Sequence, residues 1–124
     1  MNSTLAARMA AIFGFLAVAL GAFGAHALKA VLEANGKVDA WHTGALYHLV
    51  HAVVLFALAQ RATVTRLPFT LFAIGITLFS GSLYALAYTN VKFFAFITPF
   101  GGLCLLAGWL AVVIRPGLGD SQKS

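Results

Sequence analysis

The feature that most limits the fold of this chain is a series of four long apolar runs separated by short polar segments. The runs cover residues 5–28, 41–60, 67–88 and 93–114. A helix needs about 20 mostly apolar residues to cross a hydrocarbon core about 30 Å thick, because each residue rises about 1.5 Å. The sequence therefore predicts an all-α protein with one domain, an integral membrane bundle of four transmembrane helices with short loops.

The composition indicates that lipid is the main environment of the chain. Hydrophobic residues make up 61% of it and charged residues 9%, whereas a soluble domain averages about 25% charged residues. The net charge of +5 arises from basic residues that stand singly between the apolar runs. We therefore expect the lipid bilayer as a partner, and no nucleic acid. The single cysteine, Cys104, predicts neither an intramolecular disulfide nor a thiol metal motif.

The basic residues predict the orientation, because they favour the cytoplasmic side of membrane helices. With four spans, the N-terminus, the segment 61–66 and the C-terminal tail share one side, which carries five basic residues: Arg8, Arg61, Arg66, Arg115 and Lys123. The other side carries three lysines and two acidic residues. We expect both termini to be cytoplasmic. The first run also resembles a cleavable signal peptide, but it is longer than a usual signal core.

Small residues indicate where the helices pack, because close approach of backbones favours association in lipid. On the first span they recur in steps of three and four: Ala7, Ala10, Gly14, Ala17, Gly21 and Gly24. The fourth span begins near Pro99, followed by Gly101 and Gly102. Proline is tolerated in a first helical turn, where its missing N–H would have no partner. We expect both sets to be helix contacts.

The polar segment before the second span carries local signals of its own. Asn35 and Gly36 indicate a turn. Asp39 is placed to cap the following helix, and Trp41 has the position of a residue in an interfacial aromatic belt. We expect the chain to re-enter the membrane at this point.

Polar side chains on the second and third spans form a candidate layer, expected in the outer half of the membrane. Its members are Tyr47, His48, His51, Ser80 and Tyr84. On a helical wheel the first three share one face, and polar groups in hydrocarbon need partners. The layer therefore predicts hydrogen bonds between helices, a pocket for a small ligand or lipid headgroup, or a metal or haem site. No acidic residue lies in any span, and no second histidine has a matching depth on another helix, so we expect no metal or cofactor.

Five short blocks occur in order along nearly the whole chain. They are GAFGAHAL at 21–28, Tyr47-x-x-x-His51-Ala52, LFSGSLY at 78–84, TPFGG at 98–102 and Gly108-Trp109. Together they resemble domain-of-unknown-function family 423, small bacterial inner-membrane proteins, and are similar to human transmembrane protein 256. The resemblance implies a four-helix protein of the bacterial inner membrane and no known activity. It directs attention to His26 and to the layer residues inside the blocks, and it ranks His48 below His51.

Three classes of function fit these features. The first is a non-enzymatic membrane module that packs with itself as a homo-oligomer or with another membrane protein. The second is a small-ligand or lipid-binding component of a transporter or channel, although the inner half of the interior carries no ionisable relay. The third is a His-dependent haem or metal protein, which lacks a paired acid and base and a Ser-His-Asp set. We favour the first class and predict no catalytic residue.

Overall fold

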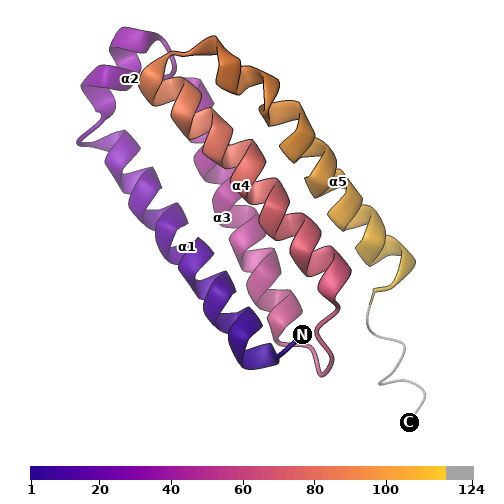
Figure 1. The fold of residues 1–124 in the computed structure, drawn as a ribbon. Coiled ribbons are helices and arrows are strands. Elements are labelled where there is room, and N and C mark those ends of the chain that lie inside the picture. The colour runs from indigo at the N-terminus through magenta and orange to yellow at the C-terminus, as the bar shows by residue number, and fades with distance from the viewer. Residues whose placement is uncertain (117–124) are drawn as a thin grey trace.

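The computed structural model describes residues 1–116, and Figure 1 shows its helices. They are α1 (Ser3–Ala25), α2 (Lys29–Asn35), α3 (Val38–Ala59), α4 (Arg66–Thr89), the 3₁₀ helix η1 (Lys92–Phe96) and α5 (Thr98–Ile114). Helices α1, α3 and α4, and η1 together with α5, are long and apolar enough to cross a membrane. The predicted all-α fold with four spans is confirmed. The polar tail, including Lys123, lies outside the described residues.

Local sequence signals account for the helix ends. Asn2 caps α1, because its side-chain oxygen accepts hydrogen bonds from the backbone N–H groups of Thr4 and Leu5. Gly36 ends α2 in the left-handed conformation with φ of 65°, which glycine adopts without steric cost. Asn90 ends α4 with φ of 56°, and asparagine is a common alternative to glycine there. These ends produce short connections and an antiparallel arrangement.

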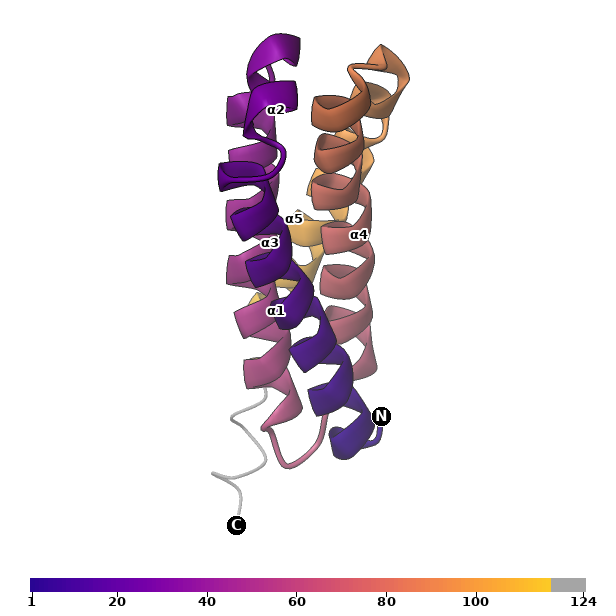
Figure 2. The same cartoon turned by 90° about the vertical axis from the view of Figure 1, so that its left-hand side faces the viewer.

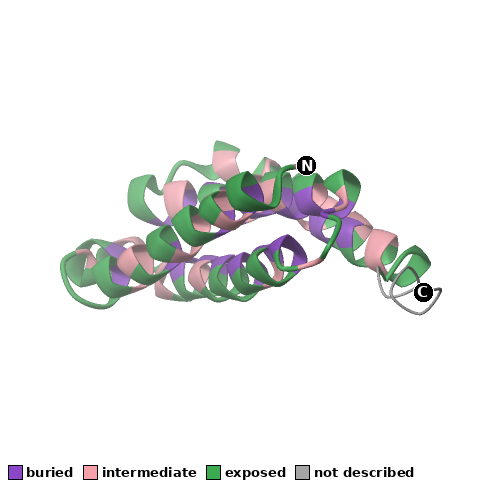
Figure 3. Ribbon diagram, turned by 90° about the horizontal axis from the view of Figure 1, so that it is seen from below, coloured by how far each residue is buried: buried purple, intermediate pink, exposed green. Residues whose placement is uncertain are grey.

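The helices pack in series rather than as a closed bundle. Helix α1 packs on α3, α3 on α4, and α4 on α5. The Cα atoms of α3 and α5 stay more than 8 Å apart, as do those of α1 and α4. In Figure 2, α1 runs obliquely in front of α3, and Figure 3 shows buried residues on the facing sides of the helices. The space between α3 and α5 is therefore spanned by side chains alone.

Two apolar clusters fill the interior. The larger lies toward the N-terminal end of α1 and includes Leu55, Phe69, Phe72, Ile76 and Leu105. The smaller lies at the opposite end and consists of Leu32, Trp41 and Ala87. Because lipid is as apolar as these side chains, their contribution is close packing rather than removal from water.

Two expectations for the start of α3 are wrong. Lys37 rather than Asp39 occupies the N-cap position, and no side chain caps the helix. Asp39 lies in the first turn, where its charge still favours the helix dipole. Trp41 is only 3% exposed, and its indole N–H donates a hydrogen bond to the carbonyl of Leu20 at 2.9 Å. This indole joins α3 to α1 and is not part of an interfacial belt.

The small-residue positions divide into tight and open ones. A Cβ atom on Gly24 would lie 2.1 Å from Nε1 of Trp41, and one on Gly101 would lie 2.2 Å from the backbone nitrogen of Phe79. A Cβ atom on Gly14 or Gly21 would meet nothing within 4 Å. The first span therefore does not present a continuous contact, because α1 touches α3 on only part of its surface.

Candidate functional site

The layer residues of α3 and α4 meet across the helix interface. Nδ1 of His48 lies 2.9 Å from the hydroxyl of Tyr84, and the hydroxyl of Ser80 donates to the carbonyl of Gly44 at 2.7 Å. His48 and Ser80 are both buried. Nε2 of His48 is also buried and has no hydrogen-bond partner within the described part of the chain. These contacts connect the two central helices through side chains that share a face on each.

His51 takes part in a different interaction and faces α5. Its Nδ1 lies 2.7 Å from the carbonyl oxygen of Tyr47, and Trp109 donates its indole N–H to Nε2 at 3.1 Å. A carbonyl oxygen only accepts, so Nδ1 carries the proton, while Nε2 offers its lone pair to the indole. This assigns the neutral imidazole and leaves neither ring nitrogen free in this arrangement.

The remaining candidate residues lie around this pair or apart from it. The Tyr47 ring is stacked on His51 with a centroid distance of 6.0 Å and an interplanar angle of 8°. The Tyr47 ring also lies against the Phe79 ring, with a centroid distance of 4.9 Å. His26 is the exposed C-cap residue of α1, and the structure does not bring it into the layer. The layer is therefore two linked sites, one between α3 and α4 and one between α3 and α5.

A groove lies where α3 and α5 are separated. Its volume is about 580 Å³, and it is lined by Tyr47, His51, Phe79, Pro99, Gly102, Leu103, Leu105, Leu106 and Trp109. None of these side chains carries a permanent charge. The hydrogen bond between Trp109 and His51 crosses from α5 to α3, and the Phe79 side chain comes from α4. The groove is apolar, with one neutral imidazole whose polar atoms are already engaged.

Close contact between α4 and α5 lies beside this groove, and Leu105 belongs to both. A Cβ atom on Gly108 would lie 2.8 Å from the ring of Phe72, and one on Gly75 would lie 2.6 Å from the side chain of Leu105. The hydroxyls of Ser82 and Thr98 are 2.6 Å apart and add a polar contact near the start of α5. These contacts hold α5 against α4. They leave the face of α5 that lies toward α3 open.

Trp109 was not among the candidate site residues chosen from the sequence. It stands in the Gly108-Trp109 block, but nothing in a single sequence shows that its indole reaches α3. Nothing in the sequence shows either that the Trp41 indole reaches the carbonyl of Leu20 on α1. A tryptophan next to a glycine inside an apolar span indicates a contact with another helix, because the indole N–H needs a hydrogen-bond partner in hydrocarbon.

The chemical capacity of the site is limited. A metal centre needs several lone pairs directed at one point, and no group of three His, Cys, Asp or Glu residues that could hold a metal ion occurs among residues 1–116. The groove presents no carboxylate beside His51. Its size and polarity suit an uncharged, elongated ligand.

Comparisons with known proteins agree with the sequence blocks. The sequence profile of a family described as a protein of unknown function (DUF423) matches residues 20–102. The UPF0382 membrane protein YwdK of Bacillus subtilis is 42% identical over 113 residues, which cover 86% of this chain and 90% of the relative. The UPF0382 membrane protein of Haemophilus influenzae is 43% identical over 109 residues, covering 84% and 86%.

The UPF0382 inner membrane protein YgdD of Escherichia coli K12 is 40% identical over 121 residues, which cover 92% of this chain and 90% of the relative. No solved structure matches the chain. The names of these relatives state a membrane location and no activity. The chain belongs to the DUF423 family and is a polytopic membrane protein of uncharacterised function.

Proposed function

We propose that this protein is a non-enzymatic module of the bacterial inner membrane that binds one hydrocarbon chain of a lipid in the groove between α3 and α5. The observation that carries the proposal is the uncharged groove of about 580 Å³. In a membrane-spanning protein, this groove faces the acyl chains of the bilayer. The name of the Escherichia coli relative supports the inner-membrane location.

The dimensions of the groove favour a single chain. Its lining on α5 extends from Pro99 to Trp109, a step of ten residues or about 15 Å along a helix. A volume of about 580 Å³ over that length gives a mean cross-section of about 39 Å², or roughly 7 Å across. A helix with side chains is about 10–12 Å wide. A hydrocarbon chain is only about 4–5 Å thick, because its carbons pack about 3.5–4.0 Å from their neighbours.

The state of His51 supports a binding role without chemistry. Tyr47 and Trp109 engage both of its ring nitrogens, so it presents neither a free base nor a free donor to the groove. Breaking these bonds in hydrocarbon would leave polar groups without partners, which is unfavourable. The hydrogen-bonded His51 and Trp109 side chains therefore form a fixed wall of the groove, and the ligand is retained by packing against this wall.

Fluorescence of Trp109 tests this proposal directly. The chain has two tryptophans, so Trp41→Phe leaves Trp109 as the only indole emitter. We expect the quenching of Trp109 to saturate as the fraction of lipid with brominated acyl chains rises, because the groove holds one chain for longer than a bulk lipid stays in contact with the indole. Quenching that only follows the bulk fraction of brominated lipid would contradict the proposal.

A matched pair of substitutions separates the groove from general lipid contact. A Cβ atom on Gly102 would lie 3.7 Å from the Phe79 ring, whereas one on Gly21 would meet nothing within 4 Å. Gly102→Leu should fill the groove and abolish saturation, and Gly21→Leu should leave it unchanged. Equal quenching curves for the two variants would overturn the assignment of the ligand to this groove.

The orientation that we propose places both termini in the cytoplasm. Arg8, the Arg61–Arg66 segment and Arg115 lie at one end of the helices, and arginine favours the cytoplasmic side. Single cysteines introduced at Ser3 and Arg115, in a Cys104→Ala background, should be labelled by an impermeant reagent only after the inner membrane is opened. Labelling of either position in intact spheroplasts would contradict this orientation.

A further inference from the structure

One end of the molecule concentrates positive charge. We call it the arginine end, and it comprises Arg8, Arg61, Arg66 and Arg115. Arg8 lies near the start of α1, Arg61 on the α3–α4 connection, Arg66 at the first residue of α4 and Arg115 just after α5. These segments meet at the lower end of Figure 1. The acidic residues of the described chain are Glu33 and Asp39, and both lie at the opposite end. Within residues 1–116, no carboxylate is available to pair with these arginines.

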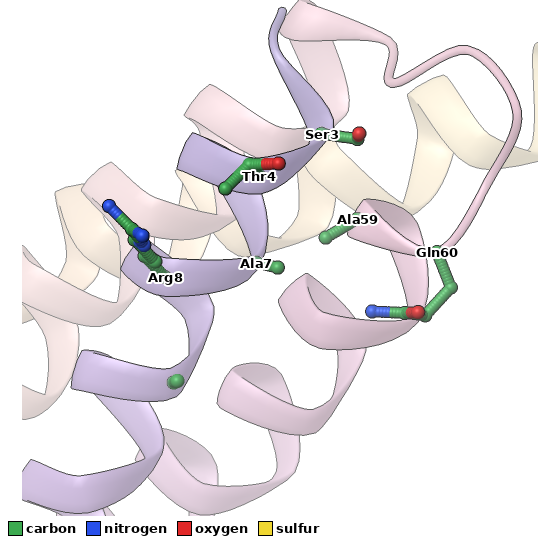
Figure 4. A pocket seen from close by; sticks show the side chains of 7 residues that line it. Ser3, Thr4, Ala7, Arg8, Ala59 and Gln60 are labelled. Atoms are coloured by element: carbon green, nitrogen blue, oxygen red, sulfur yellow. The ribbon is translucent and has the colours of Figure 1, made fainter.

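An open cavity at the surface of the arginine end has exposed polar side chains along its lining. It has a volume of about 410 Å³ and is lined by Ser3, Thr4, Ala7, Arg8, Ala11, Ala59 and Gln60. Figure 4 shows Ser3 and Thr4 near the start of α1 and Gln60 just after the end of α3, while the Arg8 side chain points away from Gln60. Hydroxyl, carboxamide and guanidinium groups all donate hydrogen bonds to phosphate oxygens.

The backbone of α1 does not create this site. Asn2 already accepts hydrogen bonds from the N–H groups of Thr4 and Leu5. The binding capacity therefore belongs to the side chains, and above all to the charge of Arg8.

Arg61 is adjacent in the sequence to a residue of this cavity but is not part of its lining. It follows Gln60 directly and is half-buried, and its Nη1 atom is shielded from solvent without a hydrogen-bond partner among the described residues. A buried guanidinium N–H without an acceptor is unfavourable.

We propose that the arginine end binds the phosphate of an anionic phospholipid headgroup at the cavity that Ser3, Thr4, Arg8 and Gln60 line. The four spans end at this level, so the cavity lies where lipid headgroups lie. Its net positive charge favours an anionic headgroup over a zwitterionic one. This site lies between α1 and α3 and is independent of the hydrocarbon groove.

Thermal unfolding of the purified full-length chain in detergent micelles tests the site. Phosphatidylglycerol and phosphatidylcholine with identical acyl chains are added in parallel titrations. We expect phosphatidylglycerol to raise Tm more than phosphatidylcholine at low ionic strength. The difference should shrink in about 1 M salt, where the Debye length is only about 3 Å. Equal Tm shifts for the two lipids would overturn the proposal.

Substitutions distinguish a built site from general attraction to charge. Arg8→Gln should remove more than half of the extra Tm shift, and Arg8→Lys should retain most of it. Arg115→Gln removes the same charge at the same end but away from the cavity, and it should retain most of the shift. Gln60→Leu leaves the charge unchanged and should weaken the shift even if Arg8→Gln fails to fold. Equal losses in Arg8→Gln and Arg115→Gln, or an unaltered shift in Gln60→Leu, would overturn the proposed site.

Discussion

Replacing Gly101 with alanine tests the contact that positions α5. A Cβ atom at this position would lie 2.2 Å from the backbone nitrogen of Phe79 and 2.6 Å from its Cα atom. Ordinary van der Waals contact begins at 3.4 Å, so the helices would have to separate by roughly 1.2 Å, the difference between 3.4 and 2.2 Å. Because the obstructing atoms are backbone, no side-chain rotation can relieve the overlap.

The cost of this separation can be estimated from known substitutions. Overpacking a well-packed interior costs about 1–3 kcal/mol, and contact with backbone places this case toward the upper end. Alanine gains about 1 kcal/mol over glycine in a helix interior. We therefore expect Gly101→Ala to lower the free energy of unfolding by about 1–2 kcal/mol. The displacement should also loosen the contacts of Gly75 and Gly108 with their partners.

The neighbouring glycine provides the control. A Cβ atom on Gly102 would lie 3.7 Å from the Phe79 ring, which is an ordinary contact, so Gly102→Ala should be as stable as the wild type or more stable. Unfolding of both variants is measured in mixed micelles with increasing sodium dodecyl sulfate, with thermal unfolding as a second measure. If Gly101→Ala proves as stable as Gly102→Ala, the close approach of α4 and α5 does not exist in solution.

Two further predictions concern α1 and the central helices. Gly24→Ala should destabilise the protein, because its Cβ atom would overlap the Trp41 indole. Gly21→Ala should not, because nothing lies within 4 Å of a Cβ atom at that position. Unfolding curves of the two variants test this, and equal stability would contradict the packing of α1 on α3. A double-mutant cycle of His48→Ala and Tyr84→Phe should give a coupling energy of about 0.6 kcal/mol and at most about 1.7 kcal/mol, the values found for hydrogen bonds between membrane helices. A coupling near zero would show that the 2.9 Å contact does not link α3 to α4.

Much of the layer could be anticipated from the sequence because it depends on helical periodicity. His48 and Gly44 are four residues apart, as are Ser80 and Tyr84, so each pair lies on one helix face. Polar groups on such faces seek one another in hydrocarbon, and the structure pairs them. The resemblance ranked His51 above His48, yet His48 is the histidine that contacts Tyr84.

Other parts could not be anticipated, because they depend on which helices are neighbours. The periodicity of α1 made its small residues look equivalent, although only the helix-to-helix geometry makes Gly24 tight and leaves Gly14 and Gly21 open. The indoles of Trp41 and Trp109 find acceptors on α1 and α3, and these acceptors are distant in the sequence. Long side chains of this kind reach partners that no local pattern specifies.

The sequence by itself determined that the chain crosses a membrane four times, because span length and apolar composition follow from the bilayer thickness. It also determined which residues share a helix face, since the helical repeat is fixed. Only the tertiary structure decided that the helices pack in series, with α3 and α5 apart. That arrangement depends on a few close contacts between backbones, and small differences in side-chain shape select among many possible helix pairings. The groove between α3 and α5 and the cavity at the arginine end are consequences of that choice.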